Sequence, residues 1–387
     1  MERRDIPFFK PYITQEEIRE IEDTLMSGWL TVGPKTKAFE EKLAEFLGVK
    51  EVVALSSCTA ALHLSLVALN IGAGDEVITT PYTFASTVAV IIQTGAKPVL
   101  VDIEPSTMNI DVSLIEGKIT DRTKAIIPVH IAGQPCDMDE IMNIARRYKL
   151  FVVEDAAHAL PAYYKGKMIG GIGNTTSFSF YATKNLVTGE GGALATDDVE
   201  LAEKIRILSL HGISKDAWKR YTSSGSWYYE VIYPGFKYNF TDIQASLGIV
   251  QLKKLKQMQQ MREDVARMYY EMLSDVEEIE LPFIKPDRRT AWHLFIIKLN
   301  PQMLDFDRNE FIDRLSERGI KTSVHFIPIH YHPYYQKIGY RKGMYPMAEA
   351  VYHRSVSLPF YPQMTEDDVK YVVENIKDII SKGRLRN

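Results

Sequence analysis

The chain has 387 residues, of which 45% are hydrophobic and 25% charged, so it is long enough for one large core and a smaller second one. Its net charge of −4 at pH 7 gives no reason to expect nucleic acid or an anionic membrane as a partner. Two cysteines are too few for a disulfide framework, and the sequence shows neither a signal peptide nor a membrane-spanning apolar run. We therefore expect a cytoplasmic protein that is not associated with a membrane.

Short apolar strands alternate with helical segments through the first half of the chain. The strands lack polar alternation, which is typical of strands buried on both faces. Strands that alternate with helices predict a mostly parallel sheet with helices on its faces. The expected strands are 51–55, 76–80, 97–103, 124–130, 150–155, 175–181 and 191–196, and the expected helices are 59–69, 83–95 and 137–148.

The pattern changes after Thr241, which is a good helix N-cap with Asp242 in the first turn. A long helical stretch begins there and leads into a smaller α+β unit. Its expected strands are 290–300 and 321–328, and its expected helices are 307–320 and 365–383. The sequence predicts an α/β protein with a large α/β/α domain over residues 1–250 and a small C-terminal α+β domain over residues 251–387.

Ligands of open α/β sheets bind beyond the carboxyl ends of the strands, so the chemistry is expected in the loops that follow them. Ser56, Ser57 and Cys58 join the first strand to a helix that begins near Thr59. The free amides of a helix N-terminus bind phosphate groups, which are also favoured by the helix dipole. By itself this loop also fits an ordinary serine N-cap.

Asp155 ends an apolar strand, and a carboxylate there is costly unless a cation pairs with it. A protonated pyridine nitrogen is one such cation. His158, three residues later, could contact the same ligand from the side. Taken alone, Asp155 could equally cap a helix, and His158 could be a core or surface histidine.

Lys184 follows another strand, with Ser179 before it and Gly189, Gly191 and Gly192 after it. A buried lysine has a lowered pKa and can attack a carbonyl group as a neutral amine. Ser179 could hydrogen-bond a phosphate, and the glycines let the backbone pass close to a ligand. An isolated lysine in a loop would more often be a solvated surface residue.

Together these features correspond to the parts of one ligand in chain order. The residues 56–60 provide a phosphate cradle, Phe84 a flat aromatic ring, Asp155 a carboxylate, Ser179 a second phosphate ligand and Lys184 an amine. Pyridoxal 5′-phosphate (PLP) has a phosphate, an aromatic ring with a basic nitrogen, and an aldehyde. The sequence therefore predicts PLP as cofactor.

The chain resembles the DegT/DnrJ/StrS family of PLP-dependent sugar-nucleotide aminotransferases, which have the fold type I architecture of the aspartate aminotransferase superfamily. The resemblance runs through nearly the whole chain. It is carried by long motifs in the family's order, including SSCTAALHLSL (56–66), TTPYTFAST (79–87), VVEDAAHALPAYYKG (152–166), SFSFYATKNLVTGEGG (177–192) and PGFKYNFTDIQASLG (234–248).

The resemblance implies a role for individual residues. Lys184 matches the lysine to which the family attaches PLP, and Asp155 matches the partner of the pyridine nitrogen. His158 stands where the family has glutamine or histidine at the phenolic oxygen of the cofactor. The other cofactor contacts that the resemblance implies are the amides of Thr59 and Ala60, the side chain of Ser179 and the stacking ring of Phe84.

The same resemblance implies a homodimer with shared active sites, because a loop residue of the other subunit reaches the phosphate. Many members have asparagine where this chain has Lys237, so either Lys237 or the nearby Asn239 is the candidate for that contact. Trp29, His325 and His330 lie in motifs that face the substrate side. The histidines of HYHPYY (330–335) have no carboxylate or cysteine at ligand spacing, so no metal site is expected.

The implied reaction is the transfer of an amino group from glutamate to a keto-sugar nucleotide, with the 4-keto position favoured. Dehydratases of the family carry histidine in place of the lysine, so Lys184 favours transamination. The alternatives are a PLP-dependent sugar dehydratase, an aminotransferase for a keto-cyclitol, and a non-catalytic regulator that binds PLP or a sugar nucleotide.

Overall fold

The structure is a computed structural model that describes residues 3–214 and 228–385. Its centre is a seven-stranded sheet with the strand order β1-β9-β8-β5-β4-β2-β3. The strands from β8 to β3 are parallel, and β9 is antiparallel to both of its neighbours. The strands are β1 (Glu51–Leu55), β2 (Glu76–Thr79), β3 (Lys97–Leu100), β4 (Thr123–Ile126), β5 (Phe151–Asp155), β8 (Thr175–Ser179) and β9 (Gly192–Thr196).

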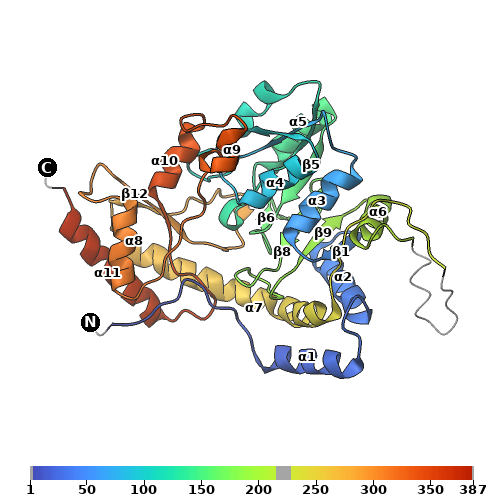
Figure 1. Cartoon of the computed structure of the whole chain (residues 1–387). Coiled ribbons are helices and arrows are strands. Elements are labelled where there is room, and N and C mark those ends of the chain that lie inside the picture. The colour runs from blue at the N-terminus through green and yellow to red at the C-terminus, as the bar shows by residue number, and fades with distance from the viewer. Residues whose placement is uncertain (1–2, 215–227, 386–387) are drawn as a thin grey trace.

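Helices cover both faces of this sheet, as the apolar strands predict (Figure 1). Alternate residues of β1 point to opposite faces: Val52 and Ala54 pack into one core, and Val53 and Leu55 pack into another. The helices on the first face are α2 (Pro34–Leu47), α5 (Met138–Tyr148) and the start of α7 (Asp242–Leu273). Those on the second are α3 (Cys58–Ala68), α4 (Ala85–Gln93) and α6 (Val199–Ser209). The fold is therefore the predicted three-layer α/β/α arrangement.

Local capping chemistry sets where the main helices begin. Thr14 closes a capping box with Glu17 at the start of α1 (Gln15–Ser27), and Thr241 closes another with Gln244 at the start of α7. The Thr241 cap confirms the predicted start of the long helix.

The second half of α7 belongs to a separate core. Leu255 and Met258 pack with the large sheet, whereas Val265 and Tyr269 pack with the C-terminal elements. Ile6 also packs into this second core. The division into domains 1–250 and 251–387 stays a proposal, and within α7 the change from one core to the other falls between Met258 and Val265. The remaining helices are α8 (Arg308–Glu317), α9 (Pro333–Lys337), α10 (Pro346–Arg354) and α11 (Glu366–Gly383).

Two small antiparallel sheets complete the structure. One sheet, with the strand order β10-β12-β13, lies within the C-terminal part. The other, with the order β11-β6-β7, joins that part to the large domain. The predicted strand 290–300 is shorter than expected, and 321–328 is not a regular strand, since only Ser323 forms a bridge, with Ser357. The strands are β6 (Tyr163–Tyr164), β7 (Lys167–Met168), β10 (Ile279–Glu280), β11 (Arg288–Arg289), β12 (Ile296–Leu299) and β13 (Ser355–Ser357).

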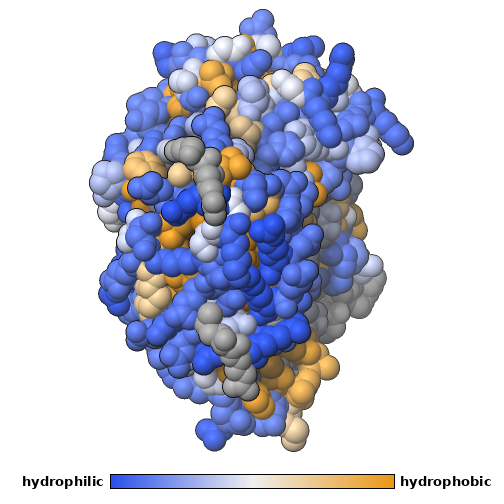
Figure 2. Space-filling view, turned by 90° about the vertical axis from the view of Figure 1, so that its left-hand side faces the viewer, coloured by the Kyte–Doolittle hydropathy of each residue, from blue (hydrophilic) through white to orange (hydrophobic). Residues whose placement is uncertain are grey.

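Hydrophobic side chains gather at one edge of the surface. Figure 2 shows them low on the molecule, at the height that α1 has in Figure 1. Leu25 and Met26 of α1 are 52% and 88% exposed, and Trp29 and Leu30 just after it are 48% and 47% exposed. Over the described ranges, no helix has both the length and the apolar character that a membrane crossing needs.

Candidate active site

The loops that follow the parallel strands meet at one edge of the large sheet and surround a cavity of about 570 Å³. N-terminal residues and residues of the C-terminal part close its other side. The sequence-predicted residues that line the cavity are Thr59, Phe84, Asp155, His158, Ser179, Lys184 and His325.

Lys184 lies in a tight turn after β8, where its backbone amide donates to the carbonyl of Tyr181 at 2.8 Å. Its amine lies 3.4 Å from Nε2 of His293. Burial disfavours the ammonium form and lowers the pKa of Lys184 to about 8, although Cys58 and Asp155 oppose this shift. About a tenth of this amine is therefore neutral at pH 7, and the fraction rises with pH, which provides the free lone pair that a nucleophile or base requires.

Asp155 ends β5 and is only 4% exposed. Its carboxylate accepts hydrogen bonds from the Thr87 hydroxyl at 2.7 Å and from the Ala157 amide at 3.1 Å. Burial raises the pKa of Asp155 despite these two bonds. A cation placed against the carboxylate would favour its ionised form, so the residue suits a protonated ring nitrogen.

Histidines occupy the side of the cavity next to Lys184. The rings of His158 and His293 have their centroids 4.3 Å apart, and Nδ1 of His158 is buried without a hydrogen-bond partner. Burial lowers the pKa of His158 well below its usual value and that of His325 to about 4. Both rings are therefore neutral at pH 7, and Nδ1 of His158 has no hydrogen-bond partner among the described residues.

The N-terminus of α3 faces the cavity through Ser57, Cys58 and Thr59. Ser57 caps the helix by accepting a hydrogen bond from the Ala60 amide at 3.0 Å. The amide of Ala60 is thus already engaged, whereas the first amides of a helix have no acceptor within it. Among the predicted amide ligands, Thr59 is accordingly the better placed.

Gly192 lets β9 pass directly beside this helix N-terminus. A Cβ atom there would lie 2.3 Å from the backbone nitrogen of Cys58 and 2.4 Å from the carbonyl carbon of Ser57. Gly192→Ala is therefore expected to lower the free energy of unfolding by about 1–3 kcal/mol, because backbone must move. Urea unfolding would measure this, with Gly117→Ala as control, since a Cβ at Gly117 meets nothing within 4 Å. Equal unfolding midpoints for both variants would contradict the expectation.

The single chain does not bring every predicted residue to the cavity. Lys237 is exposed and bonds to Asn239, and Trp29 is exposed after α1; neither lines the cavity. His330 is 0% exposed, and its Nε2 lies 2.8 Å from a carboxylate oxygen of Glu349. In this chain, His330 is thus a buried partner of Glu349 and not a cavity residue.

The cavity also contains residues that sequence reasoning missed. They come from the N-terminus, from the loop 179–191 and from the C-terminal part. Their signals were weak: His293, for example, is a histidine within an apolar run that reads as a strand. The missed residues that matter most are Phe8, Phe9, Tyr181, Glu190, His293, Phe326 and Phe360.

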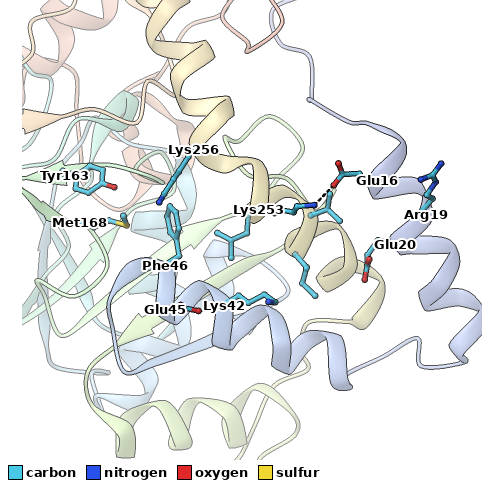
Figure 3. A pocket seen from close by; sticks show the side chains of 13 residues that line it. Glu16, Arg19, Glu20, Lys42, Glu45, Phe46, Tyr163, Met168, Lys253 and Lys256 are labelled. Carbon is cyan, nitrogen blue, oxygen red and sulfur yellow. Dashed lines mark hydrogen bonds and ion pairs between the residues drawn. The ribbon is translucent and has the colours of Figure 1, made fainter.

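A second hollow, of about 740 Å³, lies between α1, α2 and α7 (Figure 3). Its wall combines acidic and basic side chains, and Lys253 pairs with Glu16 at 3.2 Å. Among the described residues, its lining includes none of the predicted site residues. We therefore assign the chemistry to the smaller cavity around Lys184.

The three-layer fold, with a half-buried lysine and a buried carboxylate at the carboxyl edge of its sheet, defines an aminotransferase of fold type I. The chain belongs to the DegT/DnrJ/EryC1/StrS aminotransferase family, whose model matches residues 11–377.

Individual relatives agree with this assignment. The chain is 59% identical to the uncharacterized protein MJ1066 of Methanocaldococcus jannaschii, over 98% of each chain. It is 54% identical to the spore coat polysaccharide biosynthesis protein SpsC of Bacillus subtilis, over 97% of each chain. Spr1654 of Streptococcus pneumoniae is designated a sugar aminotransferase. Its structure in the PMP form matches the structure of this chain with a TM-score of 0.92, and the two sequences are 37% identical over 98% of each chain. Spr1654 is also known in a PLP form.

Proposed function

We propose that this protein is a PLP-dependent aminotransferase that moves an amino group from glutamate to a keto-sugar nucleotide, with the 4-keto position favoured. Its product would be an amino sugar for polysaccharide biosynthesis in the cytoplasm. The observation that carries the proposal is the half-buried Lys184, whose amine has a lowered pKa and lies close to the buried Asp155 in an open cavity. The designation of Spr1654 as a sugar aminotransferase and the role of SpsC in polysaccharide biosynthesis support the substrate class.

The residues of the cavity fit PLP. Among the described residues, the buried carboxylate of Asp155 forms no direct ion pair, and the buried Nδ1 of His158 has no hydrogen-bond partner. The helix N-terminus at Thr59 and the hydroxyl of Ser179 can hold a phosphate. When bound, PLP supplies an aldehyde that forms a covalent link to amines and a ring that accepts electrons.

The residues of the chain then have distinct tasks. Lys184 would anchor the cofactor and afterwards move a proton at the α-carbon of the amino acid. Asp155 would keep the pyridine nitrogen protonated, and His158 would hydrogen-bond the cofactor from the side. Phe84, at the mouth of the cavity and 61% exposed, can stack on a flat ring.

The cavity also suits a large second substrate. Its wall is rich in aromatic rings, and His325 is fixed there by a 2.8 Å hydrogen bond between its Nδ1 and Ser357. Sugar and nucleotide rings pack well on aromatic side chains. We keep His325 as the proposed substrate-binding histidine of this chain.

The donor half of the reaction provides a direct test. Enzyme loaded with PLP and mixed with glutamate alone should release about one equivalent of 2-oxoglutarate per active site, because the amino group stays on the enzyme. Release that continues to many equivalents, or no release with any amino acid, would contradict a two-step transfer. Assays of the second half of the reaction would then show whether the second substrate is a keto-cyclitol or a sugar that is dehydrated.

We propose, finally, a homodimer with shared active sites. In the sequence, three aromatic residues in the loop before α7, Phe236, Tyr238 and Phe240, suggest a surface that a second subunit covers. The structure contradicts this expectation, because Phe240 is fully buried and the other two pack on their own domain. The exposed hydrophobic side chains in and just after α1 support an interface instead.

A mixing experiment tests the shared sites. Lys184→Ala and Lys237→Glu are each expected to be inactive, and heterodimers formed from the two are expected to regain activity. Some of their sites combine an intact Lys184 from one subunit with an intact Lys237 from the other. Native mass spectrometry would verify the heterodimers. Verified heterodimers without activity, or a fully active monomer, would overturn the proposal.

A further inference from the structure

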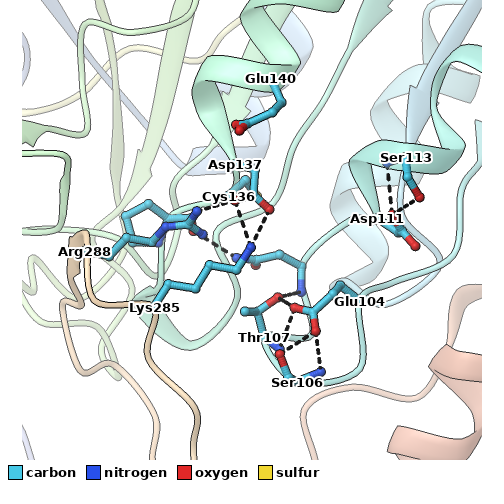
Figure 4. Close-up of polar contacts among 12 residues, drawn as sticks. Glu104, Ser106, Thr107, Asp111, Ser113, Cys136, Asp137, Glu140, Lys285 and Arg288 are labelled. Carbon is cyan, nitrogen blue, oxygen red and sulfur yellow. Dashed lines mark hydrogen bonds and ion pairs between the residues drawn. The ribbon is translucent and has the colours of Figure 1, made fainter.

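Ion pairs and hydrogen bonds to several elements hold the segment that carries His293 in place. Upstream of it, Lys285 and Arg288 both point to the carboxylate of Asp137 at the start of α5 (Figure 4). The carbonyl oxygens of the three residues before His293 each accept a hydrogen bond from a side chain. The backbone amide of His293 donates to the carbonyl of Ala132. The side-chain pairs are Gln259 Nε2 to Thr290 O at 3.0 Å, Asn185 Nδ2 to Ala291 O at 2.6 Å and Arg262 Nη1 to Trp292 O at 3.2 Å.

These bonds fix the tautomer of His293. The carbonyl of Ala291 only accepts, so the Asn185 atom that faces it is the amide nitrogen, and Oδ1 faces His293 Nδ1 at 3.3 Å. Because Oδ1 also only accepts, Nδ1 must carry the proton. The lone pair of the neutral ring then lies on Nε2, which is 3.4 Å from the Lys184 amine.

The surroundings keep this ring neutral. His293 is 5% exposed, and burial lowers its pKa well below the usual value, with Lys184, His158, Arg262 and His325 acting in the same direction. The acidic groups near Lys184 are Asp155 and Cys58, and burial raises the pKa of the Cys58 thiol well above its usual value, so the thiol is neutral at pH 7. His293 is therefore poised to accept a hydrogen bond and not to exchange a proton.

We propose that His293 accepts a hydrogen bond from the Lys184 amine and orients it toward the reacting carbon, with Asn185 holding His293 in the required tautomer. This inference rests on the proposed role of Lys184. A neutral amine has two N–H bonds and one lone pair, so an acceptor on one N–H restricts rotation about the Cε–Nζ bond. The same acceptor stabilises the ammonium that forms when Lys184 takes up a proton.

The pKa of Lys184 in the cofactor-free, full-length protein tests this contact without turnover. Trace labelling with acetic anhydride across a pH series, read by mass spectrometry, should give a midpoint of about 8 for Lys184 in the wild type. The exposed Lys37 serves as internal standard. In His293→Leu the midpoint should fall by about one unit, because the ammonium loses its acceptor but stays buried.

Matched variants separate the contact from simple packing. His293→Gln places an amide near the position of Nε2 and should keep most of the wild-type midpoint. Asn185→Ala should lower it less than His293→Leu does, and it carries the test if His293→Leu does not fold. In the PLP-loaded enzyme, His293→Leu should reduce kcat roughly 10- to 100-fold.

The proposal would be overturned by a His293→Leu midpoint equal to that of the wild type, or by equal midpoints in His293→Leu and His293→Gln. If His293→Leu does not fold, a midpoint for Lys184 in Asn185→Ala equal to that of the wild type would overturn the proposal as well. Because the labelling needs neither cofactor nor substrate, these failures are distinct from a failure of the proposed aminotransferase activity.

Discussion

Replacement of Lys184 by alanine or arginine is expected to abolish transamination. Lys184 is the only lysine among the described residues of its own chain that line the cavity, and Lys237 of the other subunit is proposed to contact the phosphate, so neither chain offers a second amine for the aldehyde. Arginine keeps the positive charge but stays protonated, so it has no free lone pair for attack or proton transfer. Non-covalent binding of PLP through the phosphate and ring contacts can persist.

Initial rates with glutamate and a keto-sugar acceptor measure this effect, and Lys37→Ala is a matched control. Lys37 lies on the exposed side of α2, where its side chain is 78% exposed. The control should keep the wild-type rate. Rates near those of the wild type in both Lys184 variants would sink the assignment of this lysine.

Asp155→Asn is expected to leave the fold intact and to reduce kcat by roughly 100-fold or more. The amide has nearly the same shape but carries no charge, so it cannot hold a proton on the pyridine nitrogen. The electron-accepting power of the ring then falls. The thermal unfolding midpoint should change little, because burial disfavours the charged carboxylate, whose direct partners are the neutral Thr87 hydroxyl and Ala157 amide.

A second carboxylate provides the control. Asp198 caps α6 by accepting a hydrogen bond from the Leu201 amide at 3.0 Å, outside the cavity. Asp198→Asn should keep its activity. If Asp155→Asn retained a rate within a few-fold of the wild type, Asp155 would be a structural group only.

Much of the fold was predictable because its signals are local. Each apolar strand, helical segment or helix cap, such as the cap at Thr241, is indicated by residues that lie within a few positions of one another in the sequence. The site residues that follow strands, including Asp155 and Lys184, were also predictable, because the carboxyl ends of parallel strands meet at one edge.

The missed features depend on contacts between distant segments. The ring of Phe240 lies 5.8 Å from that of Phe39, a partner that no local pattern around Phe240 reveals. His330 is buried because it pairs with Glu349 from α10. His293 reaches Lys184 only because the C-terminal part folds back over the large sheet. Segment 321–328 has a strand-like composition, but His325 and Phe326 line the cavity.

The most direct test of the central claim follows labelled nitrogen through the reaction. PLP-loaded enzyme would be incubated with ¹⁵N-glutamate and a panel of 3-keto- and 4-keto-sugar nucleotides, and products would be read by mass spectrometry and NMR. The account predicts ¹⁵N on the former carbonyl carbon of one sugar, with one equivalent of 2-oxoglutarate for each amino sugar. Loss of water from a sugar without nitrogen transfer, or binding of the sugars without any product, would contradict it.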